Sequence, residues 1–365
     1  MSRVSPFLFI AAFFSSSSCP APPELSEPSQ VTVETDGTVH ATSVTVPYSS
    51  LASRESRRNY LDIMHSASDL RNLSDADIAT VRKELDYRLM RPGVERLRAA
   101  FAVDITPRMI NGVQTDLVQP AGGVAERNKR RVLISLHGGG FAVGAGLGGQ
   151  MGSIPIASLG AIKVISVDYR EGPEHRFPAA SEDVAAVYRE LLKRYKPESI
   201  GIYGCSAGGV LAAESVAWFQ AHGLPIPGAI GMFGDGALFP LAGDSGYFGS
   251  LLSGMPPRTE NAKNWPYFDV PGLDVKDPLV SPAYSLSVLA RFPPSLLISG
   301  TRDSELSTVV YTHAQLIKAK VAADLHVWEG AFHCSFAQPV VDPKVPETRE
   351  AWDVIVKFFD SKLAK

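Results

Sequence analysis

A serine between glycines is the residue of this chain best placed to do chemistry. Residues 204–208 have the G-x-S-x-G form, in which a strand turns sharply into a helix and exposes the hydroxyl of the central serine, here Ser206. The flanks fit, because residues 199–203 are typical of a short buried strand and residues 209–214 open a helical pattern. We therefore predict that Ser206 is a nucleophile, the alternative being a glycine-rich packing turn.

A serine hydroxyl is a weak nucleophile at neutral pH, so Ser206 needs a general base. His333 is the favoured base, because it follows the last strand pattern on a loop that can reach the carboxyl edge of a sheet. The alternative is an ordinary surface histidine. His313 lies within a helical pattern and His326 within a strand pattern, so we expect both to be structural.

The base in turn needs an acid to orient it. Asp303 directly follows the strand pattern that ends at Ser299, and it precedes His333 by 30 residues. The resulting order Ser, Asp, His is typical of an α/β-hydrolase. Glu305 and Asp235 are rival acids, Asp235 because it follows another strand pattern.

Three glycines follow the strand pattern at residues 132–136 and suit an oxyanion hole. Glycine lets a backbone approach a substrate closely. We expect the N–H groups of Gly139, Gly140 and Ala207 to stabilise a developing oxyanion. His137, which precedes the glycines, is expected to hold their loop by hydrogen bonds rather than to act as a second base.

The elements that must position these groups alternate along the chain. Strand patterns cover residues 131–136, 162–167, 200–203, 229–233, 295–299 and 325–328, with a further pair around Asn111-Gly112. Helical patterns cover residues 181–195, 207–221, 304–319 and 346–363. Strand and helix in alternation predict an α/β fold with a mostly parallel central sheet and helices on both faces.

Two segments outside this alternation predict a cap. A helical pattern from about residue 51 to 101, with Ser74 as N-cap and an interruption at Pro92-Gly93, suggests a lid. The expected units are a leader and linker at 1–30, an N-terminal hairpin around Asp36-Gly37 with cap helices at 31–103, and a catalytic domain at 104–365. Residues 235–282, rich in Gly, Pro and aromatic side chains, suggest a cap insertion over the active site.

Composition excludes several other functions. The net charge of -3 gives no broad basic field, so we expect no nucleic-acid partner. The 3 cysteines have no metal spacing and indicate neither a zinc site nor a disulfide framework. We expect no metal and no cofactor, and a homodimer stays open.

The first residues resemble a short secretory signal. Arg3 precedes an apolar run at residues 6–14, which four serines, Cys19 and a Pro-rich stretch follow. The run is too short to span a bilayer. We expect export to the periplasm or the outside of the cell, with Cys19 as a possible lipid anchor; the alternative is a disordered leader on a cytoplasmic protein.

Several ordered motifs resemble the bacterial hormone-sensitive-lipase family of esterases. They are His137-Gly138-Gly139-Gly140-Phe141, Asp168-Tyr169-Arg170, Pro173-Glu174-His175, Phe177-Pro178-Ala179-Ala180, Gly204-Cys205-Ser206-Ala207-Gly208-Gly209 and Asp277-Pro278-Leu279-Val280-Ser281-Pro282. The resemblance covers about residue 110 to the C-terminus and implies an α/β-hydrolase fold with a helical cap. It also implies hydrolysis of short to medium acyl carboxylic esters without metal or cofactor. Cys205 stands where many members carry Asp, and Cys334 where many carry Gly, which puts the surroundings of the site in question rather than the mechanism.

Other functions compete with this interpretation. Residues 144–149 fit G-x-G-x-x-G, with Asp168 about 20 residues on, as a dinucleotide-binding fold requires. His137 and three glycines separate this motif from its strand, however, which argues against a nicotinamide-dependent oxidoreductase. A lactonase or amidase could use the same groups, and a non-catalytic small-molecule receptor is a further alternative.

Overall fold

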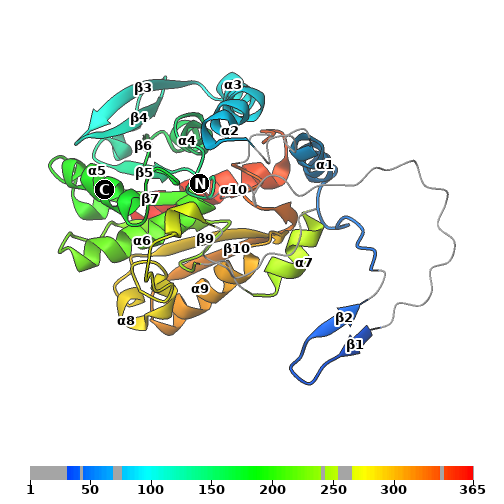
Figure 1. The fold of residues 1–365 in the computed structure, drawn as a ribbon. Helices are drawn as coiled ribbons and strands as arrows, with labels where there is room; N and C mark the ends of the chain where they lie inside the picture. Colours follow the sequence, from blue (N-terminus) through cyan, green and yellow to red (C-terminus); the bar gives the residue numbers. More distant parts are fainter. Residues whose placement is uncertain are drawn as a thin grey trace.

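The computed structural model describes residues 31–41, 44–68, 76–239, 243–253, 265–337 and 341–364. Its centre is an eight-stranded sheet of order β10-β9-β8-β7-β5-β6-β4-β3 (Figure 1). The strands are β3 (Val103–Ile110), β4 (Val113–Pro120), β5 (Val132–Leu136), β6 (Lys163–Val167), β7 (Ile200–Cys205), β8 (Ala229–Phe233), β9 (Ser295–Arg302) and β10 (Ala323–Phe332). Neighbouring strands from β6 to β10 are parallel, whereas β4 pairs antiparallel with both β6 and β3. The predicted mostly parallel sheet is confirmed.

Helices cover both faces of the sheet and bury two separate cores. One core joins the sheet to α5 (Ala179–Leu191), α6 (Ala207–Ala221), α8 (Leu286–Leu289) and α9 (Leu306–Lys318). The other joins it to α4 (Leu147–Gly160) and α10 (Pro346–Lys362), with α2 (Ile78–Leu85) and α3 (Arg91–Ala100) beyond them. Successive β5 residues serve opposite cores, Leu133 the second and Ile134 the first, because strand side chains alternate between faces.

Helix α4 is absent from the sequence-based prediction. Its side chains are apolar on most sides, because it packs against α3, α10 and the sheet, so no 3.6-residue alternation marks it. It also contains Pro155 and several glycines, which usually interrupt helices. At Gly149 a Cβ would overlap the Ser166 hydroxyl, so this glycine allows the helix to lie close to β6.

The predicted helical segment ahead of the sheet is confirmed, with one correction. Helix α1 (Arg54–Ser68) comes first, and residues 78–100 are then helical throughout, as α2, a π-helical turn at Asp86–Met90, and α3. The predicted break at Pro92-Gly93 is wrong: the backbone stays helical through Pro92, which closely follows the π-helical turn. Ser74 lies outside the described residues, and the N-cap of α2 is Asp77, whose side chain accepts from the Thr80 N–H at 2.9 Å.

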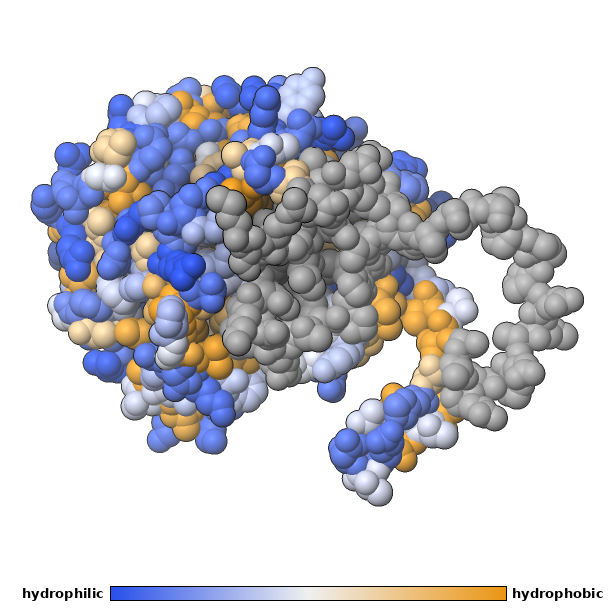
Figure 2. Space-filling model, in the orientation of Figure 1, coloured by the Kyte–Doolittle hydropathy of each residue, from blue (hydrophilic) through white to orange (hydrophobic). Residues whose placement is uncertain are grey.

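The N-terminal hairpin lies at the periphery (Figure 1). Strands β1 (Val31–Val33) and β2 (Val39–Ala41) form the predicted hairpin, with every strand residue exposed. The predicted leader, with Cys19, lies outside the described residues. None of the helices among the described residues is long and apolar enough to cross a membrane. Elsewhere the visible described surface is a mosaic of hydrophilic and hydrophobic residues (Figure 2).

Candidate active site

The turn after β7 holds Ser206 in an unusual backbone conformation. Ser206 has φ 58° and ψ -128°, and such conformations cost about 1–3 kcal/mol. The glycines around it are required by close packing: a Cβ at Gly204 would overlap the Gly208 carbonyl, and one at Gly208 would overlap the carbonyl of Leu136. The Ser206 N–H donates to the Phe233 carbonyl at 2.8 Å, which ties the turn to β8. This is the predicted strand, turn and helix.

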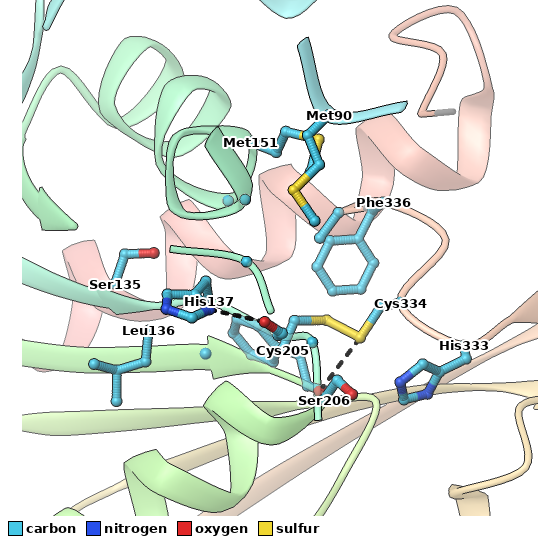
Figure 3. A pocket seen from close by; sticks show the side chains of 18 of the residues that line it. Met90, Ser135, Leu136, His137, Met151, Cys205, Ser206, His333, Cys334 and Phe336 are labelled. Carbon is cyan, nitrogen blue, oxygen red and sulfur yellow. Dashed lines mark hydrogen bonds between the residues drawn. A yellow bond between two sulfur atoms is a disulfide. The ribbon is translucent and has the colours of Figure 1, made fainter. Parts of the chain in front are cut away.

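Asp303 and His333 meet at the same edge of the sheet. His333 Nδ1 lies 2.9 Å from Asp303 Oδ1, and the imidazole ring lies beside the Ser206 side chain (Figure 3). The Asp303 carboxylate is fully buried and also accepts from the Ser299 hydroxyl at 3.0 Å and from the Glu305 N–H at 2.9 Å. The structure therefore brings together the three residues that the sequence proposed as nucleophile, acid and base.

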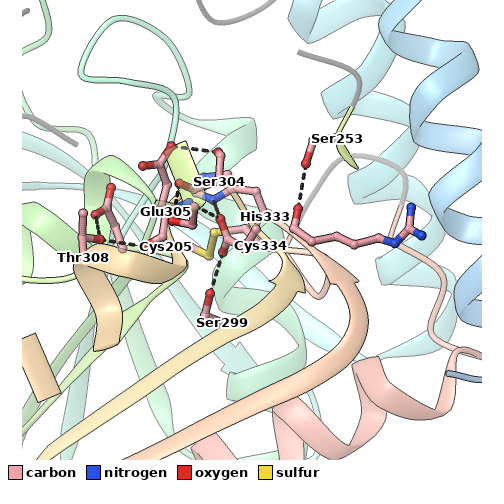
Figure 4. A network of polar contacts seen from close by, with 12 residues as sticks. Cys205, Ser253, Ser299, Ser304, Glu305, Thr308, His333 and Cys334 are labelled. Atoms are coloured by element: carbon pink, nitrogen blue, oxygen red, sulfur yellow. Dashed lines mark hydrogen bonds and ion pairs between the residues drawn. A yellow bond between two sulfur atoms is a disulfide. The ribbon is translucent and has the colours of Figure 1, made fainter. Parts of the chain in front are cut away.

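The rival acids are engaged elsewhere in the same network (Figure 4). Asp235 Oδ1 accepts from the Thr308 hydroxyl at 2.7 Å and from the Gly236 N–H at 2.9 Å. Burial, followed by the nearby charge of Glu305, raises the pKa of Asp235 well above its usual range. Glu305 accepts from the Ser304 hydroxyl at 2.9 Å. The geometry thus favours Asp303 as the partner of His333.

The glycine loop after β5 lies against the serine. A Cβ on Gly138 would stand 2.9 Å from the Cys205 carbonyl oxygen and 3.2 Å from Ser206 Cβ. Gly139 and Gly140 adopt φ 111° and 63°, and both line the same pocket as Ser206. On the other side of the serine, Ala207 is the first residue of α6, and the first N–H groups of a helix have no partner within it.

His137 has the structural role that the sequence predicts. Its ring stacks on Tyr169 with centroids 4.1 Å apart, and Nδ1 lies 2.8 Å from the Gly138 carbonyl, the arrangement of an Nδ1–H donor. Burial lowers the pKa of His137 to about 4, so the ring is neutral at pH 7. The Tyr169 hydroxyl donates to the His137 carbonyl at 2.7 Å. These contacts hold the start of the glycine loop.

Known proteins with similar sequences and structures have the same fold. The sequence pattern of the α/β hydrolase fold matches residues 133–337. The crystal structure of esterase E25 is 31% identical, with a TM-score of 0.74, over 88% of this chain and 98% of that chain. This chain belongs to the α/β hydrolase fold family.

Further relatives place the hydrolase within one group of that family. An esterase of the bacterial hormone-sensitive lipase family is 26% identical, with a TM-score of 0.71, over 86% of this chain and 99% of that chain. An acetyl-hydrolase of Streptomyces hygroscopicus is 28% identical over 236 residues, which are 64% of this chain and 76% of the relative. Esterase LipU of Mycobacterium tuberculosis is 28% identical over 263 residues, 67% and 82% of the two chains. The protein is a hormone-sensitive-lipase-type carboxylic ester hydrolase.

The pocket of this esterase is apolar and reaches past the serine between α4 and α10. Its cavity volume is about 290 Å³. Residues from the helices ahead of the sheet line part of it, namely Ile63, Met64, Leu85, Leu89 and Met90. Met151, Phe336, Trp352 and Ile355 line it as well, and in Figure 3 Phe336 lies nearer to Ser206 than the two methionines do. The cap and the sheet domain therefore build the pocket together.

Among the described residues of the insertion at 235–282, Ser253 is the one that lines that pocket. The insertion contains α7 (Ser245–Leu252), after which Ser253 lines the cavity. Tyr267 and Phe268 are instead buried against Phe141, with ring centroids 4.7 and 5.1 Å away. Among the described residues, then, much of the predicted cap insertion supports the glycine loop from the side of the first core.

Arg82 joins the cap to the glycine loop, a role that the sequence did not reveal. From α2, its guanidinium donates to the carbonyl of Ala142 at 2.8 Å and to that of Gly172 at 2.9 Å, and it pairs with Glu174 at 2.8 Å. Arg82 belongs to an amphipathic helix, where a charged residue is ordinarily solvated. Sequence alone therefore had no signal for this clamp.

A disulfide joins Cys205 to Cys334, with Cα atoms 6.3 Å apart. The expectation that the cysteines indicate no disulfide framework is corrected to this extent, because the fold brings together two cysteines that lie 129 residues apart. Cysteine number and spacing could not show this pairing, which depends on the order of β7 and β10 in the sheet.

The G-x-G-x-x-G motif has a structural role. Its central Gly146 donates its N–H to Asp168 Oδ1 at 2.8 Å, and α4 begins at the next residue. The carboxylate that would hold a ribose in a dinucleotide-binding fold is thus bonded to the motif itself. Strand β5 ends at Leu136, well before the motif, which also argues against that fold.

Proposed function

We propose that this esterase hydrolyses short to medium acyl carboxylic esters through an acyl-enzyme formed on Ser206. The observation that carries the proposal is the hydrogen bond between His333 and Asp303 beside a serine at a sharp turn between strand and helix. An imidazole held in this way keeps Nδ1 protonated and leaves Nε2 to act as the base. The apolar pocket at the same serine supplies room for an acyl chain.

In the first half-reaction Ser206 Oγ attacks the ester carbonyl carbon while His333 Nε2 takes the hydroxyl proton. The carbonyl oxygen becomes an oxyanion, which accepts hydrogen bonds from the N–H groups of Gly139, Gly140 and Ala207. Collapse of this intermediate breaks the bond to the alcohol, which leaves with the proton from His333. Asp303 orients the imidazole and stabilises the imidazolium, without itself taking a proton.

In the second half-reaction water replaces the alcohol. His333 takes a proton from the water, whose oxygen attacks the acyl carbon, and the same backbone donors stabilise the second oxyanion. Its collapse releases the carboxylic acid and returns the proton to Ser206. Every step uses groups of this chain and water.

The size of the pocket supports substrates of modest length. A cavity of about 290 Å³ lies just below the range of about 300–1,000 Å³ for small-molecule sites. Met90, Met151 and Phe336 line the same cavity as the serine, where they would contact an acyl chain (Figure 3). One relative is named an acetyl-hydrolase, which agrees with a short acyl group.

A panel of p-nitrophenyl esters of rising chain length tests the proposal, with a lactone and an anilide for the lactonase and amidase alternatives. We expect kcat/KM to peak at short to medium chains and Ser206→Ala to lower it by about 10⁴-fold or more. An organophosphate should add covalently to Ser206. Wild-type rates in the Ser206→Ala variant would contradict the mechanism, and ligand binding without turnover of any ester would indicate a receptor.

The sequence of the first 30 residues also supports export. The disulfide agrees with this proposal, because disulfides persist in oxidising compartments. N-terminal sequencing and mass analysis of the protein from its native host would distinguish a cleaved signal from a lipidated Cys19. An intact Met1 on the mature protein would exclude export through a cleaved signal.

A further inference from the structure

The disulfide connects the chain neighbours of the two residues that the proposed mechanism requires to exchange a proton. Cys205 directly precedes Ser206, and Cys334 directly follows His333. The link is therefore a short covalent path from the backbone of the nucleophile to the backbone of the base, across 129 residues of sequence. Figure 3 shows the sulfur atoms beside both side chains, at the wall of the substrate pocket.

Besides the disulfide, Asp303 and Trp352 hold the turn that carries His333, since Asp303 bonds the imidazole and Trp352 Nε1–H donates to the Phe336 carbonyl at 3.1 Å. The pairing of β10 with β9 ahead of the turn is irregular, because the register shifts between Trp328 and Phe332. Within the turn, the Ser335 N–H donates to the Phe332 carbonyl at 3.1 Å and the Ala337 N–H to the Cys334 carbonyl at 2.7 Å. These bonds close the turn on itself and do not tie it to the serine.

The backbone at both ends of the disulfide is strained, so we expect the histidine turn to change conformation when the link is removed. Cys334 has φ 51°, a left-handed conformation that is costly for a residue with a side chain. Ser206, at the other end of the link, has φ 58°. The disulfide thus joins two unfavourable backbone conformations, one on each side of the reaction centre.

The end of β8 packs closely against the disulfide. Cys334 is buried, and its Sγ lies 3.7 Å from the Phe233 carbonyl oxygen, the same oxygen that accepts from the Ser206 N–H. At Gly234 a Cβ would lie 2.5 Å from Cys334 Sγ and 3.2 Å from the His333 ring. The end of β8 therefore packs against the link and the base together.

We propose that the Cys205–Cys334 disulfide is a positioning element that holds His333 at reacting distance from Ser206. The inference rests on the proposed function, since it concerns the base of that mechanism. Without the link the turn relaxes, the imidazole moves away from the hydroxyl, and the chemical step slows while substrate still binds. A displacement of about 1 Å at a reacting group can cost about 100-fold in rate.

Two double variants test the proposal, both made with Cys19→Ser so that no other thiol is present. Cys205→Ser with Cys334→Ala removes the link and leaves residue 334 strained. Cys205→Ser with Cys334→Gly removes the link but lets residue 334 adopt φ 51° at little cost. Both are compared with Cys19→Ser alone, at a temperature well below each melting transition.

We expect kcat of the alanine variant to fall by about 10- to 100-fold with KM changed less than threefold, and the glycine variant to recover part of kcat. If the disulfide only stabilised the fold, its removal would lower the melting temperature and leave kcat of the folded variant unchanged. An alanine variant with wild-type kcat, or one in which only KM rises, would overturn the proposal. Either result would leave the proposed function standing, because Ser206→Ala tests the nucleophile independently of the disulfide.

A measurement on the folded enzyme covers the case in which neither double variant folds. A small phosphine can enter the pocket, whose wall includes both cysteines. It gives two electrons to the disulfide, takes an oxygen atom from water to become a phosphine oxide, and leaves two thiols. Loss of kcat in proportion to the thiols formed supports the proposal, whereas thiols formed at full activity contradict it.

Discussion

The turns that carry Ser206 and His333 are held in place by different means. Close backbone packing holds the serine turn, because Gly204 and Gly208 admit neighbouring carbonyl groups where any Cβ would overlap them. The histidine turn depends on partners from distant segments, namely the Asp303 carboxylate and the disulfide to Cys205. The proposed nucleophile and base thus combine one side chain placed by local packing with another placed by tertiary links.

The largest expected effect tests the carboxylate that holds the histidine turn. Asp303→Asn should lower kcat by about 10⁴-fold, because an amide favours the wrong imidazole tautomer. The matched change Asp235→Asn should cost less than about tenfold, since Asp235 is bonded to Thr308 and Gly236. Steady-state kinetics on one ester would check both, and the reverse order of effects would make Asp235 the acid.

Gly208→Ala tests the packing of the serine turn. The added Cβ overlaps the Leu136 carbonyl, so we expect the free energy of unfolding to fall by about 3 kcal/mol or more, with loss of activity. Gly246→Ala is the control, because nothing lies within 4 Å of its Cβ and alanine suits a helix. Thermal unfolding would compare them. Equal stability of the two variants would mean that packing does not hold the turn.

Removal of the disulfide should lower stability as well as rate. For a closed loop of this length we expect Cys205→Ser with Cys334→Ala to lower the free energy of unfolding by about 2–5 kcal/mol. Denaturant titration measures this loss. If the free energy of unfolding did not change, the disulfide would not stabilise the fold and its role would be limited to positioning the histidine turn.

Arg82→Ala tests the clamp from the cap to the glycine loop. This loop packs against the serine turn, as local packing holds that turn, but it also depends on a distant side chain, as the histidine turn does. Loss of the Arg82 bonds to Ala142 and Gly172 should lower kcat/KM by about tenfold, because the proposed oxyanion donors lose support. Lys83→Ala is the matched control, since it removes an exposed positive charge from the same helix. Equal kinetics of the two variants would exclude the clamp.

The smallest expected effect concerns Asp168 and pH. Burial raises the pKa of Asp168 to about 6 from a usual 3.8, so the folded protein holds this proton more tightly than the unfolded chain does. Asp168 therefore stabilises the fold below about pH 4, and that stability is lost as pH rises to about 6. In Asp168→Asn the free energy of unfolding should fall by about 1 kcal/mol less between about pH 4 and pH 6 than in the wild type. Denaturant unfolding at several pH values would measure this difference. An unchanged slope would assign the decline to other groups.

Regular strands and helices were predictable where their patterns were local. The strand expected at residues 229–233 is β8, and the helix expected at 207–221 is α6. Helix α4 was missed because burial on most sides removes the alternation that marks a helix. The break expected at Pro92-Gly93 failed because a π-helical turn just before the proline changes the backbone hydrogen-bond pattern there.

Sequence by itself determined the serine turn and the glycine loop, because short-range steric demands on the backbone require particular residues at particular spacings, and it supplied the order of the proposed nucleophile, acid and base. Tertiary structure decided which of three acids meets His333, that Cys205 pairs with Cys334, and that Arg82 reaches the glycine loop. These choices depend on which strand ends become neighbours in the sheet, and nothing in the local sequence around either partner specifies that.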